Sequence, residues 1–240
     1  MKTIFVLALT ITASAAILGA ASSPGQPAPA SPTDEELVDR FLRSDRPALT
    51  SYRAYRRLEA STRGGKMTAW LETWTSLDAD GTFHFEVVRE SGSELIRNRV
   101  LRKALETEQG VANDREASQV RLTRDNYDFQ MGADEGDLAT IGLLPRRSSP
   151  MLLNGTVTVT RPDGDVVRIG GRLSETPSWW TRRVDIVQRY ARVNGVRVPV
   201  EMSSRADVRV AGDSTFLMTY RYVTINGVAT DSGASRSSAN

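Results

Sequence analysis

Cysteine is absent from the 240 residues, and histidine occurs once, at His84. Without thiols the chain has no disulfide bonds, no thiol nucleophile, no thiolate metal site and no lipid-modified N-terminal cysteine. A single histidine argues against a multi-histidine metal centre and against a histidine-based nucleophile triad, so we interpret His84 as an ordinary strand residue. We therefore expect no metal and no cofactor, and we assign no catalytic residue.

An excess of charge of one sign is also missing, because 31 Lys and Arg face 29 Asp and Glu, a net charge of +2. Only Lys2, Lys66 and Lys103 are lysines, and the many arginines alternate with acids along the predicted strands. No basic stripe of the kind that binds nucleic acid is visible. No glycine-rich phosphate loop precedes a helix, and no GxSxG motif occurs.

Long apolar runs are confined to the N terminus. Residues 1–21 combine Lys2, an apolar run over 4–18 and small residues before position 22, which predicts a cleaved signal peptide. The alternative is an N-terminal membrane anchor, although the run is short for a spanning helix. Residues 22–32 form a Pro/Ala/Ser linker, and we expect one domain over 33–227 followed by a disordered tail over 228–240. The chain is thus expected to be exported, without a stable membrane span after cleavage.

The most regular stretch lies near the C terminus, where apolar and polar residues alternate with a period of two. One phase of residues 196–210 is apolar and the other is charged or polar. The same alternation continues in residues 216–222, and it is also present in the residues before the Asn194-Gly195 turn. A two-residue turn there would put Arg189 opposite Val200 and mix the two faces. We expect one extra residue, either in a three-residue loop or in a bulge near Pro199. The following turn is expected at 211–213.

The remaining elements follow from period and turn signals. Thr33 with Glu36 predicts a capping box that starts a short helix. Alternating patterns predict three strands, over residues 49–62, 67–77 and 82–90. A tight turn between the first two would place Thr62 opposite Met67, so that residues on the same face are paired. Residues 93–108 predict an amphipathic helix, 110–125 a loop, and 126–132, 138–146, 151–160 and 165–174 shorter strands. The fold class is mainly β: a curved antiparallel half-barrel of about ten to eleven strands with two helices, the longer covering the concave apolar face.

Carboxylates that alternate with arginines, namely Asp185, Glu201 and Asp207, are interpreted as solvated or paired across strands rather than as an acid/base couple. Trp179, Trp180 and Arg182 allow two interpretations. They form an amphipathic lip at a cavity mouth, or they begin a strand with one Trp packed inward.

The segment from Tyr190 through Asn194-Gly195-Val196-Arg197-Val198-Pro199, together with the order of helix, three strands, helix and meander, resembles the outer-membrane lipoprotein-sorting proteins, which share the LolA/LolB-like fold of the periplasmic lipoprotein carriers. The resemblance covers roughly residues 33–227 and is closer to an uncharacterised exported branch. It implies an open half-barrel with helices over an apolar cavity for acyl chains, and a periplasmic location.

We hypothesise a non-catalytic binding protein of the bacterial cell envelope that carries a lipid or a lipoprotein acyl chain. The residues expected to line its cavity are Ile96, Val100, Leu101, Val198, Val200, Met202, Val208, Phe216, Met218, Tyr220 and Tyr222. The same residues are equally compatible with a closed core. The alternative function is a structural or regulatory envelope module that binds a protein partner through a sheet edge. An enzyme acting on envelope lipids or glycans is the least favoured hypothesis.

Overall fold

A computed structural model of the chain describes residues 33–43, 47–111, 121–176, 181–209 and 212–231. The predicted signal peptide and linker, and the tail from residue 232, lie outside the described residues. The helices are α1 (Asp34–Leu42), α2 (Glu94–Ile96), the π-helical turn η1 (Arg97–Leu101) and α3 (Arg102–Val111). The strands are β1 (Tyr52–Thr62), β2 (Met67–Leu77), β3 (Phe83–Gly92), β4 (Tyr127–Glu135), β5 (Leu138–Pro145), β6 (Leu153–Thr160), β7 (Val166–Leu173), β8 (Thr181–Val193), β9 (Val196–Val208), β10 (Gly212–Ile225) and β11 (Val228–Ala229).

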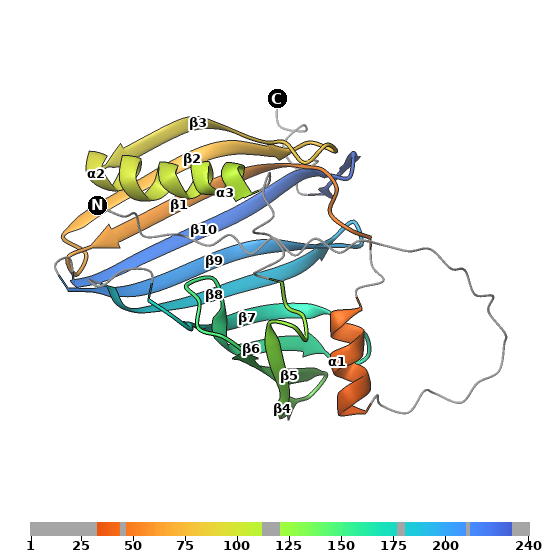
Figure 1. Ribbon diagram of the computed structural model, residues 1–240. Helices are drawn as coiled ribbons and strands as arrows, with labels where there is room; N and C mark the ends of the chain where they lie inside the picture. Colours follow the sequence, from red (N-terminus) through yellow and green to blue (C-terminus); the bar gives the residue numbers. More distant parts are fainter. Residues whose placement is uncertain (1–32, 44–46, 112–120, 177–180, 210–211, 232–240) are drawn as a thin grey trace.

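All of these strands belong to one antiparallel sheet in the order β3-β2-β1-β10-β9-β8-β7-β6-β5-β4, with β11 paired to β10. The sheet does not close, because β3 and β4 remain its two edges. Figure 1 shows a curved sheet with the helices over its two ends: α2 and α3 over β1, β2 and β3, and α1 near β5, β6 and β7. We call the helix-bearing side the inner face and the opposite side the outer face. The expected open half-barrel, mainly β with two helical regions, is confirmed.

The capping box predicted for α1 is present. The Thr33 backbone N–H donates to Glu36 Oε2 at 2.9 Å, and the Glu36 N–H donates to Thr33 Oγ1 at 3.4 Å. In addition to its capping box, α1 is attached to the turn between β6 and β7, where Arg40 Nη1 donates to the Pro162 carbonyl at 2.7 Å. The Phe41 ring meets Phe129 of β4 edge to face, with centroids 5.9 Å apart.

The helical residues 94–111 form one continuous element, which we call the long helix; it extends three residues beyond the predicted 93–108. Its π-helical turn accounts for the five-residue spacing between the apolar residues Ile96 and Leu101. Residues five apart share a face in a π turn, so Ile96 and Leu101 both point to the sheet and are both buried. The hydrogen bond from the Gln109 amide to the Phe83 carbonyl, at 3.1 Å, ties the end of the helix to edge strand β3.

The register of two hairpins agrees with the parity argument. In the β1–β2 hairpin, Thr62 opposes Met67 and Leu58 opposes Leu71, as predicted. In the β8–β9 hairpin the Asn194-Gly195 loop has two residues, and the extra residue is a bulge that places Arg189 opposite Glu201 but Tyr190 opposite Pro199. Of the two expected solutions, the bulge near Pro199 is therefore the one adopted.

Two boundaries near the C terminus differ from expectation. Val208 pairs with Gly212, so β10 begins inside the predicted 211–213 turn. The strand pairing is displaced from the predicted register by an even number of residues, so each side chain stays on its predicted face of the sheet. The predicted tail starts too early, because Val228 pairs with Ile225 in β11. Thr230 is buried, and its hydroxyl donates to the Tyr222 carbonyl at 2.6 Å, which anchors the chain past residue 228.

The inner face supplies the hydrophobic core. One contiguous cluster of buried side chains includes residues from each of the strands β1 to β10, from α1 and from the long helix. Middle strands β8, β9 and β10 contribute Ile186, Met202 and Met218, which are at most 5% exposed. The backbone contacts of the long helix are concentrated on β1, β2 and β3. The described helices thus lie over the two ends of an apolar surface that continues across the middle of the sheet (Figure 1).

Candidate ligand-binding face and the buried arginine network

Most of the residues predicted to line a cavity meet on the inner face. Within the buried cluster lie Ile96, Leu101, Val198, Met202, Val208, Phe216, Met218 and Tyr222, and Val100 and Tyr220 pack against it while partly buried. Val200 is the exception. It is the extra residue of the β9 bulge, is half-buried, and is not part of the apolar cluster, because the bulge removes it from the alternation. That these residues bind a ligand remains a prediction.

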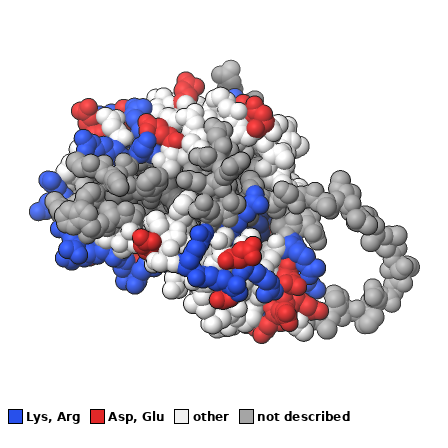
Figure 2. All heavy atoms as spheres, in the orientation of Figure 1, with Lys and Arg blue, Asp and Glu red and all other residues white. Residues whose placement is uncertain are grey.

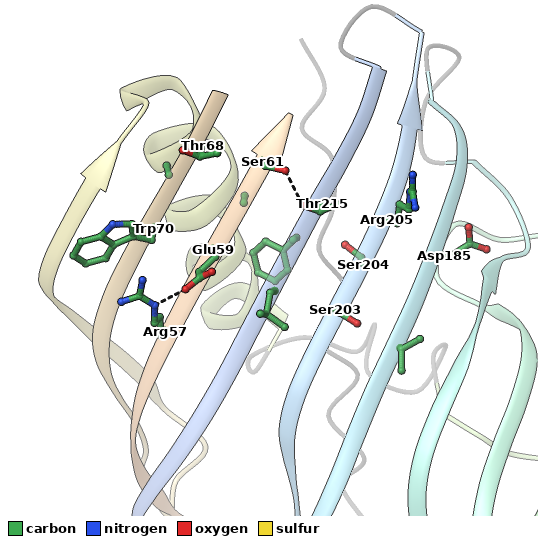
Figure 3. A pocket seen from close by; sticks show the side chains of 15 residues that line it. Arg57, Glu59, Ser61, Thr68, Trp70, Asp185, Ser203, Ser204, Arg205 and Thr215 are labelled. Carbon is green, nitrogen blue, oxygen red and sulfur yellow. Dashed lines mark hydrogen bonds and ion pairs between the residues drawn. The ribbon is translucent and has the colours of Figure 1, made fainter. Parts of the chain in front are cut away.

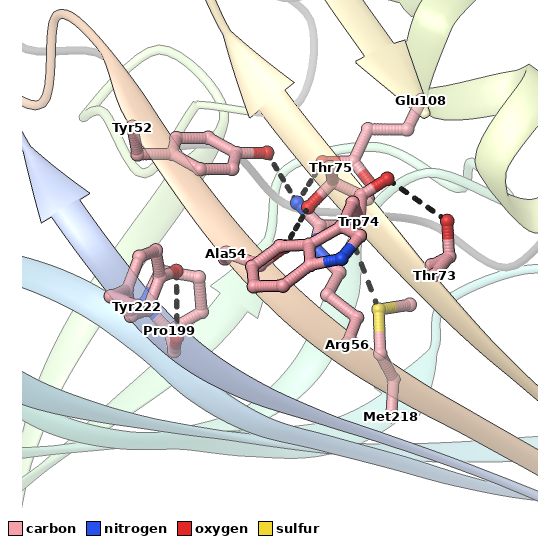
Figure 4. A network of polar contacts seen from close by, with 10 residues as sticks. All are labelled: Tyr52, Ala54, Arg56, Thr73, Trp74, Thr75, Glu108, Pro199, Met218 and Tyr222. Carbon is pink, nitrogen blue, oxygen red and sulfur yellow. Dashed lines mark hydrogen bonds and ion pairs between the residues drawn. The ribbon is translucent and has the colours of Figure 1, made fainter. Parts of the chain in front are cut away.

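A charged group lies within this apolar face, beneath the long helix. Arg56 of β1 is 1% exposed, and its guanidinium makes two bonds to the Glu108 carboxylate of the long helix, at 2.6 and 3.0 Å. A third bond runs from Arg56 Nη2 to the Tyr52 hydroxyl. Figure 4 shows the carboxylate reaching down from the helix to the guanidinium between the strands. This bidentate ion pair is a direct polar connection between the long helix and β1.

Aromatic rings surround the same guanidinium. Arg56 Cζ lies 4.5 Å from the Tyr220 ring centroid, 5.4 Å from that of Phe83 and 5.5 Å from that of Tyr52. Burial, the largest single cause, would lower the pKa of Arg56, but the Glu108 carboxylate together with Tyr52 and Tyr220 more than offsets it, and the pKa is raised well above its ordinary value. Arg56 therefore stays charged, and its charge is neutralised by Glu108.

The sequence contained a signal for Arg56 that the predictions did not use. Arg56 stands on the same phase as the apolar Ala54 and Leu58, where a charged residue is out of place. A charge on an apolar phase implies a buried partner, because an unpaired buried ion is costly. The identity of that partner, Glu108, 52 positions later, follows only from the three-dimensional fold.

Four tyrosines lie on the inner face, three of them close to Arg56 and the fourth, Tyr190, near Tyr220 and Arg197. Burial raises the pKa of Tyr52, Tyr190 and Tyr222 above the ordinary value, and it raises the pKa of Tyr220 to about 12. The Tyr222 hydroxyl donates to the Pro199 carbonyl at 2.9 Å (Figure 4). The Tyr190 hydroxyl is buried and has no hydrogen-bond partner among the described residues. It is thus a polar atom placed in the apolar face with unused bonding capacity.

The outer face is organised differently, as rows of polar side chains across the strands. A groove of about 580 Å³ crosses β2, β1, β10, β9 and β8, and its lining includes Trp70, Leu217 and Val187 (Figure 3). Arg57 lies over the Trp70 ring at 4.7 Å and is also bound to Glu59 and Glu72. A second groove of about 750 Å³ continues over β6 and β7. Charges lining the first groove are largely paired, which is typical of a solvated sheet surface.

The three carboxylates that the sequence predicted to be solvated or paired across strands all have arginine partners. Glu201 accepts from Arg189 at 3.1 Å, and Asp185 binds Arg183 and lies 3.6 Å from Arg172. Asp207 lies 3.7 Å from Arg182, the described residue of the predicted lip. Trp179 and Trp180 lie outside the described residues, so neither interpretation of the lip is decided.

The polar chemistry elsewhere is sparse. His84 is 57% exposed at its side chain, and its Nε2 lies 3.3 Å from Asp78 Oδ2. Within the described ranges, no group of three or more His, Cys, Asp or Glu is placed to hold a metal ion. None of the helices in the described part of the chain is both long and apolar enough to cross a membrane.

No protein-family model and no curated protein matches the sequence. Among solved structures, the chain is similar to a DUF1329 family protein from Desulfovibrio piger, with 11% identity, a TM-score of 0.38, and coverage of 78% of this chain and 89% of that one. It is also similar to the MucA/MucB complex of Pseudomonas aeruginosa, with 10% identity, a TM-score of 0.24, and coverage of 78% and 93%. Neither similarity is close enough to carry an argument about function.

Proposed function

We propose that the protein is an exported, non-catalytic binding protein of the cell envelope that shelters the acyl chain of a lipid or lipoprotein on the inner face of its sheet. The observation that carries the proposal is the extent of that face. Apolar side chains continue across β1 to β10, while the described helices lie over the two ends of the sheet. The resemblance of residues 190–199 to the lipoprotein carriers supports the same function.

The energetics of such binding require no catalytic group. Each methylene of an acyl chain moved from water to an apolar face contributes about 0.8 kcal/mol. The middle strands offer flexible side chains, Met202 and Met218, which adapt to ligands of different shape. The buried hydroxyl of Tyr190 is available to bond the polar end of an acyl group, such as an ester carbonyl.

The long helix is suited to be the movable part of the site. Its polar attachments are the Arg56–Glu108 pair to β1 and, along edge strand β3, the ion pairs of Arg97 and Arg102 with Glu90 and the hydrogen bond from Gln109 to the Phe83 carbonyl. Its remaining contacts with the sheet are made by apolar side chains such as Leu101 and Leu105. An acyl chain entering beneath the helix would replace apolar contacts by apolar contacts. The exchange therefore costs little compared with the separation of a polar interface.

The test is native mass spectrometry of the protein purified from its host, followed by titration with a fluorescent fatty acid. We expect a copurified lipid, or displacement of the fluorescent probe by unlabelled fatty acid. Tyr190→Phe is expected to weaken binding of a fatty ester while leaving the fold intact, and Tyr222→Phe is the matched control because its hydroxyl is already bonded to Pro199. A protein that is free of lipid and also ignores the fatty acid would contradict the proposal.

The alternative, a partner bound along a sheet edge, is less well supported by the geometry of the edges. Edge strand β3 carries a bulge at Val88, between the pairs Glu72–Arg89 and Thr73–Val87. Edge strand β4 has an irregularity between Met131 and Asp134. Bulges at both edges interrupt the regular ladder that an added strand needs. A partner retained from envelope extracts with no lipid bound would favour this alternative.

A further inference from the structure

The turns of the sheet are sorted by charge. Consecutive turns of an antiparallel meander lie at opposite ends of its strands, so the β1–β2, β5–β6 and β9–β10 turns share one end. We call this end the basic rim; its turn residues include Arg63, Lys66, Arg146, Arg147 and Arg209. The β2–β3, β4–β5, β6–β7 and β8–β9 turns lie at the opposite end, which we call the acidic rim; it carries Asp78, Asp80, Asp137, Asp163 and Asp165, together with Arg161 and with Arg192, which is bound to Asp165.

Two turns of the basic rim lie side by side although they are far apart in sequence. Because β1 pairs with β10, the Gly64 N–H of one turn donates to the Asp213 carbonyl beside the other at 3.4 Å. The hydroxyls of Thr62 and Ser214 are 2.8 Å apart. The first residue of β8, Thr181, pairs with the last residue of β9. The pairing of β1 with β10 therefore gathers cations that the sequence keeps separate.

The acids near these turns are already bound to arginines. Asp213 accepts from Arg205 at 2.5 Å, and Asp207 lies 3.7 Å from Arg182. These pairs neutralise the strand ends, and Arg146 of the β5–β6 turn is likewise bound to Asp128. The cations of the β1–β2 and β9–β10 turns are therefore the source of the local charge.

Three of those cations are exposed: Arg63, Lys66 and Arg209. Within the part of the chain that the structure describes, none of the three has a carboxylate within ion-pair distance. Figure 2 shows Lys and Arg side chains gathered at the left end of the molecule, where Figure 1 places the β1–β2 turn. The protein is thus electrically asymmetric although its net charge is only +2.

We propose that the basic rim docks on the surface of a bilayer that contains anionic phospholipid. A row of cations on adjacent turn tips matches the negative potential of such a surface, which extends about one Debye length, roughly 10 Å at 0.1 M salt. The acidic rim at the far end would be repelled, so the protein would stand on the membrane with one defined end down. This inference rests on the proposed function, because docking brings the inner face to a source of acyl chains.

The experiment is sedimentation of the full chain with phosphatidylcholine vesicles that contain or lack 30 mol% phosphatidylglycerol. We expect binding to the anionic vesicles, little binding to neutral ones, and release by about 0.5 M salt. Arg63→Gln, Lys66→Gln and Arg209→Gln together are expected to weaken binding about fivefold per cation, on the order of a hundredfold in total. All three are exposed, and circular dichroism will show that the variant is folded.

The matched control removes three exposed arginines from other regions, Arg43, Arg189 and Arg221, as Gln. Its net charge equals that of the basic-rim variant, so a difference between the two measures the position of the charges. Equal loss in both variants would overturn the proposal, as would equal binding to neutral vesicles or tighter binding to RNA than to anionic vesicles. Fatty-acid binding by the basic-rim variant should be unchanged. Absence of fatty-acid binding by the unaltered protein, with its vesicle binding intact, would instead contradict the proposed function alone.

Discussion

The ion pair between Arg56 and Glu108 makes the sharpest prediction about how the long helix is held. Replacing Glu108 with Ala leaves the Arg56 guanidinium charged inside the apolar face, where its side chain is 2% exposed. Removing one partner of a buried pair costs about 3–5 kcal/mol. That loss is a large part of the roughly 5–15 kcal/mol by which a domain is usually stable. Glu108→Gln should cost less, because the amide oxygen still accepts a hydrogen bond.

The double variant tests the reasoning. Arg56→Met with Glu108→Ala removes both charges and places an apolar side chain next to Met218 and the Tyr220 ring. We expect it to recover most of the loss, so that the coupling between the two sites exceeds about 2 kcal/mol. Urea unfolding at pH 7, followed by circular dichroism, measures all of these free energies.

The control is the exposed pair Arg189–Glu201 on the outer face, whose side chains are 59% and 33% exposed. Glu201→Ala should change the free energy of unfolding by no more than about 1 kcal/mol. If Glu108→Ala cost as little as Glu201→Ala, or if the losses at Arg56 and Glu108 simply added, the interpretation of the pair as the buried attachment of the helix would be refuted.

Four further outcomes follow from the structure. Tyr190→Phe should stabilise the ligand-free protein by about 1 kcal/mol in urea unfolding, because it removes a buried hydroxyl without a described partner; a destabilisation would contradict this. The free energy of unfolding should be constant between about pH 7 and 10 and fall as pH rises from 10 toward 12, because burial raises the pKa of the inner-face tyrosines in the folded state, to about 12 for Tyr220; each contributes up to about 1.4 kcal/mol per pH unit in urea titrations at successive pH values. Gly155→Ala should cost about 2–3 kcal/mol, since an added Cβ would lie 2.1 Å from the Gly170 carbonyl oxygen, and a neutral effect on the melting curve would exclude so close an approach of β6 and β7. Thr33→Ala should cost about 1 kcal/mol in the same assay through loss of the α1 cap, unless α1 is held by its packing alone.

Features set by neighbouring residues were predictable from the sequence. The capping box of α1, the β1–β2 register and the bulge near Pro199 each follow from parity or from side chains a few positions apart. Val200 shows the limit of this reasoning. The bulge was one of two expected solutions, yet Val200 was still assigned to the apolar phase that the bulge removes it from.

Features that depend on long-range pairing could not be predicted in the same way. Nothing local indicates that β1 pairs with β10, and that pairing brings Arg63 and Arg209 to one rim. Alternation of charges along each strand concealed the segregation of charges between the turns. The partner of Arg56 was hidden for the same reason, because Glu108 approaches it only when the long helix lies across β1.

The central claim is that the inner face binds an acyl chain, and photolabelling tests it most directly. A fatty acid bearing a diazirine would be irradiated with the full chain, and the tryptic peptides 198–205 and 210–221 would be sequenced by mass spectrometry. The account predicts label on inner-face residues such as Met202 and Met218, and loss of label when unlabelled fatty acid competes. Label confined to their outer-face neighbours Ser203 and Leu217, or label that no competitor reduces, would contradict it.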